Sequence, residues 1–150
     1  KSFQSEVSSE KPNFDRLLLR VNYLWNNFCY SNDAIYGSNM LPGIPEHYLR
    51  AELLYEHPCG FYIGPNLEYV PVGYSIDSQG TIFTDSYALL GAKIGWRTGH
   101  GLSAYFEVKN IIDTTYTATS GVVANAGGLD VAQFLPGEGR GFYVGIEYLW

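Results

Sequence analysis

The sequence ends in GFYVGIEYLW, residues 141–150. Every second residue of this stretch is large and apolar or aromatic: Phe142, Val144, Ile146, Tyr148 and Trp150. Because the side chains of a strand point alternately to its two faces, the pattern predicts a β-strand with one wholly apolar face. The termini of soluble domains usually fray. An aromatic residue that closes an ordered strand is instead typical of a bilayer interface, where aromatic side chains form a belt.

The same alternation recurs in five further segments. They are DRLLLRVNYLWN (15–26), HYLRAELLYEH (47–57), FYIGPNLEYV (61–70), YALLGAKIGWR (87–97) and GLSAYFEVKN (101–110). Each is about 10 residues or longer, which is the length that crosses a bilayer at a tilt, whereas soluble strands average about five or six. A seventh, weaker strand is predicted in FQSEVSS (3–9). Pro65 predicts a local break in pairing because proline cannot donate to a ladder.

The predicted strands are joined alternately by short and long links. EHPCG (56–60) and RTGHG (97–101) are tight turns, whereas residues 31–46, 71–85 and 112–140 are long connections. Outer-membrane barrels have short periplasmic turns and long extracellular loops. The sequence therefore predicts an all-β fold, an antiparallel up-and-down transmembrane β-barrel segment of six to seven long strands. Standing alone, these strands are expected to form a curved open sheet with exposed edges.

Composition narrows the function classes. The 150 residues fit one domain, and the net charge of −6 excludes a nucleic-acid partner, which requires a basic face. No run approaches about 18 consecutive apolar residues, so no transmembrane helix is predicted. The chain opens without Met or an apolar signal segment, so either a signal peptide has been removed or the chain is an internal piece. The predicted topology places Cys29 and Cys59 at opposite ends of the strands, which predicts no disulfide between them.

Four stretches together resemble the C-terminal barrel of TonB-dependent receptors. They are LPGIPEHYLRAELLY (41–55), YALLGAKIGW (87–96), FEVKNIIDTTY (106–116) and PGEGRGFYVGIEYLW (136–150). Within them, VKNIID (108–113) is similar to an Asn-Leu-Phe-Asp-type motif at the end of the penultimate strand. LPGIP (41–45) is similar to a proline-containing strand entry. The terminal alternation of residues 142–150 is similar to the signature read by the barrel-assembly machinery.

The resemblance implies a fold, a function and a location. It implies the last six strands of a 22-stranded barrel, so that residues 1–150 are the C-terminal portion of a receptor whose plug and earlier strands are absent here. It implies uptake of a ferric siderophore or a similar scarce nutrient across the outer membrane, driven by the TonB energy-transducing complex. Outer-membrane lipid and the assembly machinery are the further implied partners, and no cofactor is implied.

No catalytic or metal site is predicted. His47, His57 and His100 lack the spacing of metal ligands, and no serine or cysteine has a supporting base. The glycine-rich GEGRG (137–141) precedes a strand rather than a helix, so it predicts a turn instead of a phosphate site.

Ligand contacts are predicted in two loops. A connection as long as residues 113–139 is usually functional, and its candidate residues are Tyr116, Asn125, Asp130 and Gln133. The second candidate group is Tyr74, Asp77 and Gln79. Charges of both signs on the predicted lumen face either pair with one another or contact a plug: Arg50, Glu52, Glu56, Glu68, Lys93, Glu107, Lys109 and Glu147.

Two other readings stay open at the level of sequence. The first is a small self-contained outer-membrane barrel with a structural or adhesive role, which requires eight strands. The second is a soluble secreted β-sandwich that binds a partner, which predicts strands well short of ten residues. An enzyme is the weakest reading.

Overall fold

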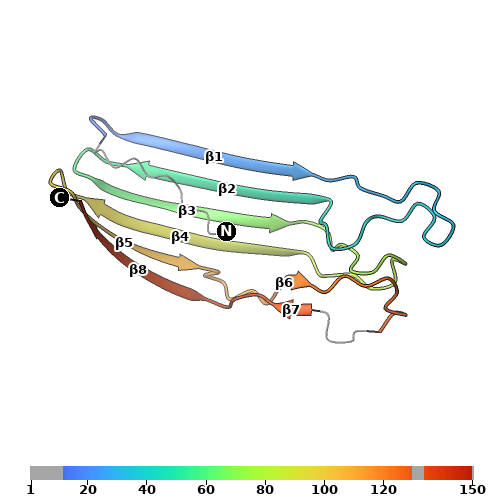
Figure 1. The fold of residues 1–150 in the computed structure, drawn as a ribbon. Helices are drawn as coiled ribbons and strands as arrows, with labels where there is room; N and C mark the ends of the chain where they lie inside the picture. Colours follow the sequence, from blue (N-terminus) through green and yellow to red (C-terminus); the bar gives the residue numbers. More distant parts are fainter. Residues whose placement is uncertain (1–11, 130–133, 150) are drawn as a thin grey trace.

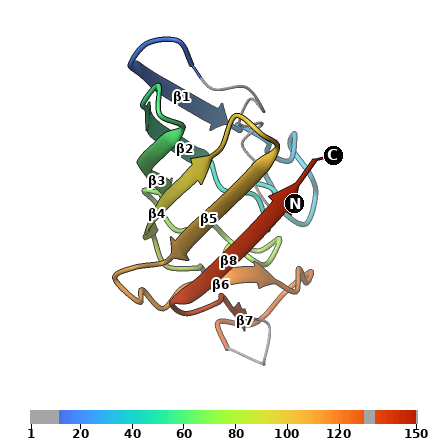
Figure 2. The same cartoon turned by 90° about the vertical axis from the view of Figure 1, so that its left-hand side faces the viewer.

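The computed structural model describes residues 12–129 and 134–149. Six strands form one antiparallel sheet in the order β1-β2-β3-β4-β5-β8 (Figure 1). Their bounds are β1 Arg16–Trp25, β2 His47–Glu56, β3 Phe61–Val70, β4 Tyr87–Arg97, β5 Leu102–Lys109 and β8 Gly141–Tyr148. The sheet is curved and does not close, with β1 and β8 as its outer strands (Figure 2). The predicted up-and-down order and the open sheet are both confirmed.

Two details differ from the expected strands. β5 and β8 contain 8 residues each, which is shorter than predicted. β5 ends at Lys109 because the next residue, Asn110, has a positive φ of 50° and turns the chain. The 113–139 connection also carries a small antiparallel sheet of its own, formed by β6 Thr117–Ser120 and β7 Phe134–Pro136. The strand predicted in residues 3–9 lies outside the described residues.

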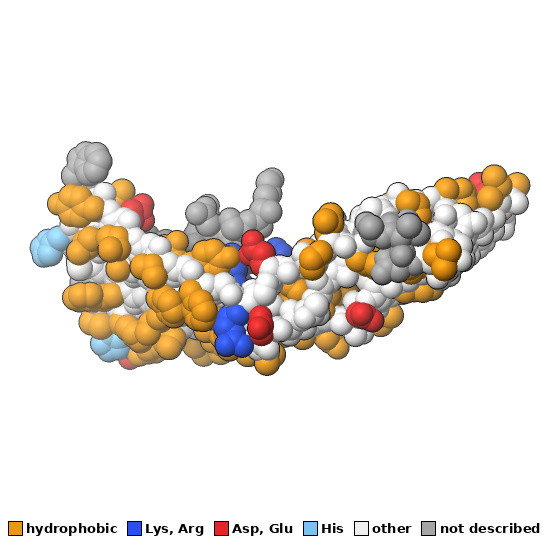
Figure 3. All heavy atoms as spheres, turned by 90° about the horizontal axis from the view of Figure 1, so that it is seen from below, with side chains coloured by type: hydrophobic (Ala, Val, Ile, Leu, Met, Phe, Trp, Pro, Cys, Tyr) orange, Lys and Arg blue, Asp and Glu red, His pale blue; other side chains and the backbone are white. Residues whose placement is uncertain are grey.

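The alternation along each strand gives the sheet two chemically different faces. On one face the apolar side chains are highly exposed, with Leu19 at 68% and Ile146 at 75%. Hydrophobic side chains cover much of the strand half of the molecule when it is seen from below (Figure 3). The other face carries the charged side chains, and its buried hydrophobic residues include Leu54, Tyr62 and Val70. Apolar side chains outside and polar side chains inside is the reverse of a soluble domain.

Short turns and long links lie at opposite ends of the strands, as predicted (Figure 1). Residues 57–60 and 98–101 form the short turns, in which Gly60 and Gly101 have φ values of 94° and 83°. Such angles suit glycine because it lacks a Cβ. Trp96 Nε1 donates to the carbonyl of Cys59 at 2.9 Å and so ties β4 to the first turn. Cys29, by contrast, belongs to the link after β1, at the other end of the sheet.

Pro65 interrupts the pairing of β3 on one side. The β2–β3 ladder runs from Leu49↔Tyr69 to Glu52↔Asn66 and resumes at Tyr55↔Ile63 in the same register. On the β4 side the ladder is continuous, and Pro65 stands opposite Ala92. The local break predicted at this residue is therefore confirmed toward β2.

Candidate functional site

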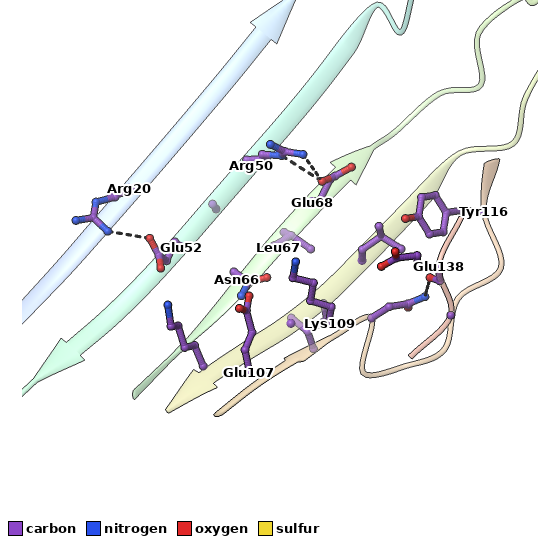
Figure 4. A pocket seen from close by; sticks show the side chains of 17 residues that line it. Arg20, Arg50, Glu52, Asn66, Leu67, Glu68, Glu107, Lys109, Tyr116 and Glu138 are labelled. Atoms are coloured by element: carbon purple, nitrogen blue, oxygen red, sulfur yellow. Dashed lines mark hydrogen bonds and ion pairs between the residues drawn. The ribbon is translucent and has the colours of Figure 1, made fainter. Parts of the chain in front are cut away.

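Ion pairs cross the strands on the polar face. Arg20 Nη1 lies 3.0 Å from Glu52 Oε2, and Arg50 Nη2 lies 2.8 Å from Glu68 Oε2 (Figure 4). Both pairs join residues that stand directly opposite each other in the register. Alternation along the strands places these side chains on one face, and the register brings opposite charges together. Of the charges expected to pair with one another on this face, Arg50 and Glu68 do so, whereas Glu52 pairs with Arg20.

Glu56 is the most enclosed charge of this face. It is 1% exposed and contacts two arginines, with Arg16 Nη2 at 2.6 Å and Arg97 Nη2 at 2.9 Å. The guanidinium of Arg97 also lies over the ring of Tyr62, 4.4 Å from its centroid. A buried carboxylate requires such compensation because its desolvation is costly.

The two lysines of the polar face lie over tyrosine rings. Lys93 Nζ is 4.7 Å from the Tyr105 centroid, and Lys109 Nζ is 4.7 Å from the Tyr143 centroid. Such cation–π contacts hold a lysine near a surface without neutralising its charge. The carboxylate of the neighbouring Glu107 makes no hydrogen bond or ion pair with the described residues.

A concavity of about 470 Å³ lies on the polar face, and its lining includes Arg20, Arg50, Glu52, Glu68, Lys93 and Lys109 (Figure 4). Its walls are the paired charges of β1 to β3 on one side and the lysines of β4 and β5 on the other. Tyr116 and Glu138, from the link between β5 and β8, close it at the loop end. A hollow with both signs of charge suits a polar partner that presents complementary groups.

The long links converge on one short segment, residues 75–78, which we call the loop hub. Its residues Ser75, Ile76, Asp77 and Ser78 are all buried although they lie outside the six-stranded sheet. The hub belongs to the β3–β4 loop (71–86) and contacts the β1–β2 loop (26–46) and the β5–β8 loop (110–140).

Hydrogen bonds from two loops hold the hub. From the β1–β2 loop, the amide of Gly43 donates to the carbonyl of Ser75 at 2.7 Å, and Tyr30 donates to Ser78 Oγ at 2.9 Å. From the β5–β8 loop, Val123 N donates to the carbonyl of Ile76 at 3.2 Å, and its own carbonyl accepts from Ser78 N at 3.1 Å. The three loops therefore form one hydrogen-bonded cluster.

Asp77 lies at the centre of the hub and is 0% exposed. Its carboxylate accepts from Thr81 Oγ1 at 2.6 Å, from Thr81 N at 2.8 Å and from Ala126 N at 3.0 Å. Burial works to raise the pKa of Asp77, but hydrogen bonds from Thr81, Ala126 and Ile82 outweigh it and lower the pKa to about 2. Its place favours a role in joining loops over direct contact with a ligand.

Asn110 and Asp113 hold the base of the β5–β8 loop, a role that the sequence reasoning missed. Asn110 is 4% exposed; its Nδ2 donates to the carbonyls of Thr114 at 2.9 Å and Glu138 at 3.2 Å. Asp113 Oδ1 accepts from the amide of Arg140 at 2.9 Å. Both residues have positive φ. The VKNIID stretch carried the signal, since Asn and Asp are the non-glycine residues that tolerate such angles.

The other predicted ligand residues are dispersed over the loops. Tyr116 packs against Tyr87 with centroids 4.9 Å apart, at the end of the concavity. Tyr74 is partly buried, and burial raises the pKa of its hydroxyl, which therefore stays protonated. Gln79 is partly exposed. Asn125 is exposed and accepts from Gly127 N at 2.7 Å. Asp130 and Gln133 lie outside the described residues, and ligand contact by any of this set stays a prediction.

The terminal strand has the predicted exposed face. Phe142, Val144, Ile146 and Tyr148 are all strongly exposed, and Trp150 lies outside the described residues. Within residues 12–129 and 134–149 no group of three or more metal-ligating side chains is found. Among the described residues there is no α-helix that could span a bilayer.

Comparison with known proteins decides the family. Residues 4–111 match the family model of the TonB dependent receptor-like β-barrel. The chain belongs to this family. TonB-dependent receptors are transport receptors rather than an enzyme family. This TonB-dependent receptor barrel segment is 30% identical over 110 residues, 71% of the chain, to the catecholate siderophore receptor Fiu of Escherichia coli K12. It spans 13% of the length of that relative.

Solved structures agree with the sequence relatives. The closed form of the ferric-catecholate import receptor Fiu from E. coli K12 superimposes with a TM-score of 0.64 and 25% identity, covering 88% of this chain and 18% of that one. The open form of the same receptor gives a TM-score of 0.57 over 74% of this chain and 16% of that one. The antiparallel barrel architecture predicted from the sequence is therefore confirmed, with the sheet left open in this segment.

Proposed function

We propose that residues 1–150 form the C-terminal portion of the barrel of an outer-membrane receptor that imports a ferric siderophore with energy from TonB. The observation that carries the proposal is the inverted sheet, with its apolar side chains exposed and its charges inside. Water would make so much exposed apolar surface unfavourable, whereas lipid tails accept it. Outer-membrane lipid and the barrel-assembly machinery are accordingly proposed partners.

The strand lengths support the same placement. Strands β1 to β4, of 10 or 11 residues, are long enough to cross an apolar band about 25 Å tall at a tilt, as barrel strands do. The polar face then lines the barrel interior, where paired charges such as Arg50 and Glu68 are compatible with water or a polar protein segment. The long links form the extracellular surface, and the short turns face the periplasm.

The ligand class follows from the relatives. The receptors that the chain matches are named for catecholate siderophores and for ferric-catecholate import. We propose a ferric chelate of this kind as the cargo. The proposed contacts are the loop residues Tyr74, Gln79, Tyr116, Asn125, Asp130 and Gln133. The buried Asp77 is proposed to act by shaping the loops.

Iron uptake tests this proposal directly. The full-length polypeptide that contains this chain is produced in a Gram-negative host that lacks its own ferric-catecholate receptors. Radioactive iron is supplied as the ferric tris-catecholate complex, with ferric citrate as the control chelate. We expect iron to be taken up from the catecholate complex and not from ferric citrate. This uptake should be lost when TonB is deleted. Uptake that is absent, or that persists without TonB, would contradict the proposal.

A further inference from the structure

The carboxylate of Asp77 divides its hydrogen bonds between two loops. Oδ1 accepts from Thr81 N at 2.8 Å and Ile82 N at 3.4 Å, both within the β3–β4 loop. Oδ2 accepts from Ala126 N of the β5–β8 loop at 3.0 Å. Oδ1 therefore binds its own loop, and Oδ2 binds the neighbouring loop in addition to Thr81 of its own loop.

Thr81 doubles this connection. Its hydroxyl donates to Asp77 Oδ2 at 2.6 Å and accepts from the amide of Gly128 at 3.0 Å. The amides of Ala126 and Gly128 are thus both bound by the β3–β4 loop, two residues apart. We call this arrangement the loop clasp, made of Asp77 and Thr81 on one side and residues 126–128 on the other.

The clasp sits beside a third loop. A Cβ added to Gly43 of the β1–β2 loop would approach Val122 Cγ2 to 2.6 Å, so these two loops are in close contact next to the hub. Separating the β5–β8 loop would break the two clasp bonds and leave a buried carboxylate short of a donor, which is costly. The contacts therefore favour one joined body over three independently moving loops.

We infer that Asp77 and Thr81 are positioning residues for cargo capture, which hold residues 123–128 on the β3–β4 loop so that the loops present one preformed surface. A preformed surface binds more tightly because less conformational freedom is lost on binding. The capture part of this inference rests on the proposed function, whereas the joining of the loops does not. The exposed residues beside the clasp, such as Asn125, would then meet the cargo without rearrangement.

Hydrogen exchange of the full-length receptor in detergent tests the clasp without any ligand. Thr81→Val removes the hydroxyl at constant shape, and Asp77→Asn replaces one acceptor oxygen with a donor. We expect amides 123–128 to exchange about fivefold faster or more in both variants, the effect of losing one hydrogen bond. Thr81→Ser keeps the hydroxyl and should match the parent. Asp85→Asn, in an exposed residue of the same loop, is the matched control. Unchanged exchange in Thr81→Val would overturn the inference.

Binding of ferric tris-catecholate to the same proteins tests the capture step. We expect Thr81→Val to weaken binding severalfold and Thr81→Ser to restore it. A residue that contributed only its bulk would give the opposite order, because valine keeps the shape of threonine and serine does not. Faster exchange with unchanged affinity would mean that the clasp joins the loops without serving capture, and would overturn the positioning role. If the parent receptor binds no ferric catecholate, the proposed function and the capture step fail together, and the exchange data still decide whether the clasp exists.

Discussion

Tyr105 of β5 lies across Gly145 of β8, the residue directly opposite it in the register. A Cβ at Gly145 would come within 2.3 Å of Tyr105 Cε1. The same relationship joins Tyr62 of β3 to Gly95 of β4, where the added Cβ would lie 2.4 Å from the ring. The row Tyr62, Gly95, Tyr105, Gly145 therefore alternates ring and glycine across neighbouring strands of the polar face.

Gly145→Ala is expected to destabilise the barrel by about 1–3 kcal/mol because the methyl group overpacks against the Tyr105 ring. Urea unfolding of the full-length protein in lipid vesicles measures this change. The double variant Tyr105→Ala with Gly145→Ala removes the obstacle, so the two effects should be non-additive by about 1 kcal/mol or more. Additive effects would show that the ring does not occupy the space above Gly145.

Asn110→Gly is expected to loosen the base of the β5–β8 loop. Glycine keeps the positive φ of this position but loses the amide that binds the carbonyls of Thr114 and Glu138. The loss should cost about 2 kcal/mol and make residues 110–140 several times more sensitive to limited proteolysis. Asn125→Ala in the same loop, where a single turn bond is lost, is the control. Equal sensitivity in the two variants would argue against a special role for the base.

The loop clasp should loosen in acid. The pKa of Asp77 is lowered to about 2 in the folded protein, below the value of about 3.9 for an unfolded aspartate. Its stabilising contribution is therefore full above the unfolded pKa and is lost as the pH falls from about 4 to about 2. A spin label on Asn125→Cys, with Cys29 and Cys59 replaced by serine, reports the mobility of the β5–β8 loop around residue 125.

The spectra should be constant from about pH 8 to pH 5 and show a more mobile label in the acid range. With Asp77→Asn the label should be mobile throughout. Mobility that does not depend on pH in the parent background would argue against Asp77 as the titrating group.

The charge pairs of the polar face should differ sharply in their contribution to the free energy of unfolding. Glu56→Gln leaves the largely buried Arg97 without its carboxylate, and breaking a buried pair costs about 3–5 kcal/mol. Glu52→Gln removes the partner of Arg20, whose side chain is 34% exposed, and should cost about 1 kcal/mol or less. Chemical unfolding in the same vesicles compares the two variants. Similar losses of unfolding free energy in the two variants would show that the burial of Glu56 does not determine how much its ion pairs stabilise the protein.

Two arginine substitutions on one strand test which face meets lipid. Leu19→Arg places a charge on the apolar face of β1 and should destabilise the folded barrel by about 2–4 kcal/mol in vesicles. Leu24→Arg, on the polar face of the same strand and opposite Tyr48, should be nearly neutral. If both variants were tolerated equally in vesicles, the apolar face would not be in contact with the bilayer.

The sheet was predictable because its signal is local and periodic. Alternation over ten residues fixed each strand, and the turns at His57 and His100 set the order of the strands. The shorter β5 was not visible, because its end depends on the positive φ of Asn110 rather than on hydropathy.

The loops were harder, because their contacts join residues far apart in the chain. The sequence predicts Asp77 as a ligand contact in a loop, yet the residue is buried by a segment some 50 positions away, which no periodicity encodes. Nothing in the sequence points to Thr81, since a single threonine in a loop carries no pattern. The VKNIID stretch was recognised by its resemblance, whereas its hydrogen bonds to the far end of the loop required the fold.

Because the loop hub joins the three long links, the sequence of one link cannot change independently of the other two. A substitution in residues 26–46 or 113–129 has to preserve contacts to residues 75–78, so sequence drift in one loop constrains drift in the others. Exchange of loops between related receptors should therefore succeed when all three loops are exchanged together and fail when only one is exchanged. Foreign epitopes should be displayed at exposed positions away from the hub, such as Ile35, and not between Ser75 and Ser78.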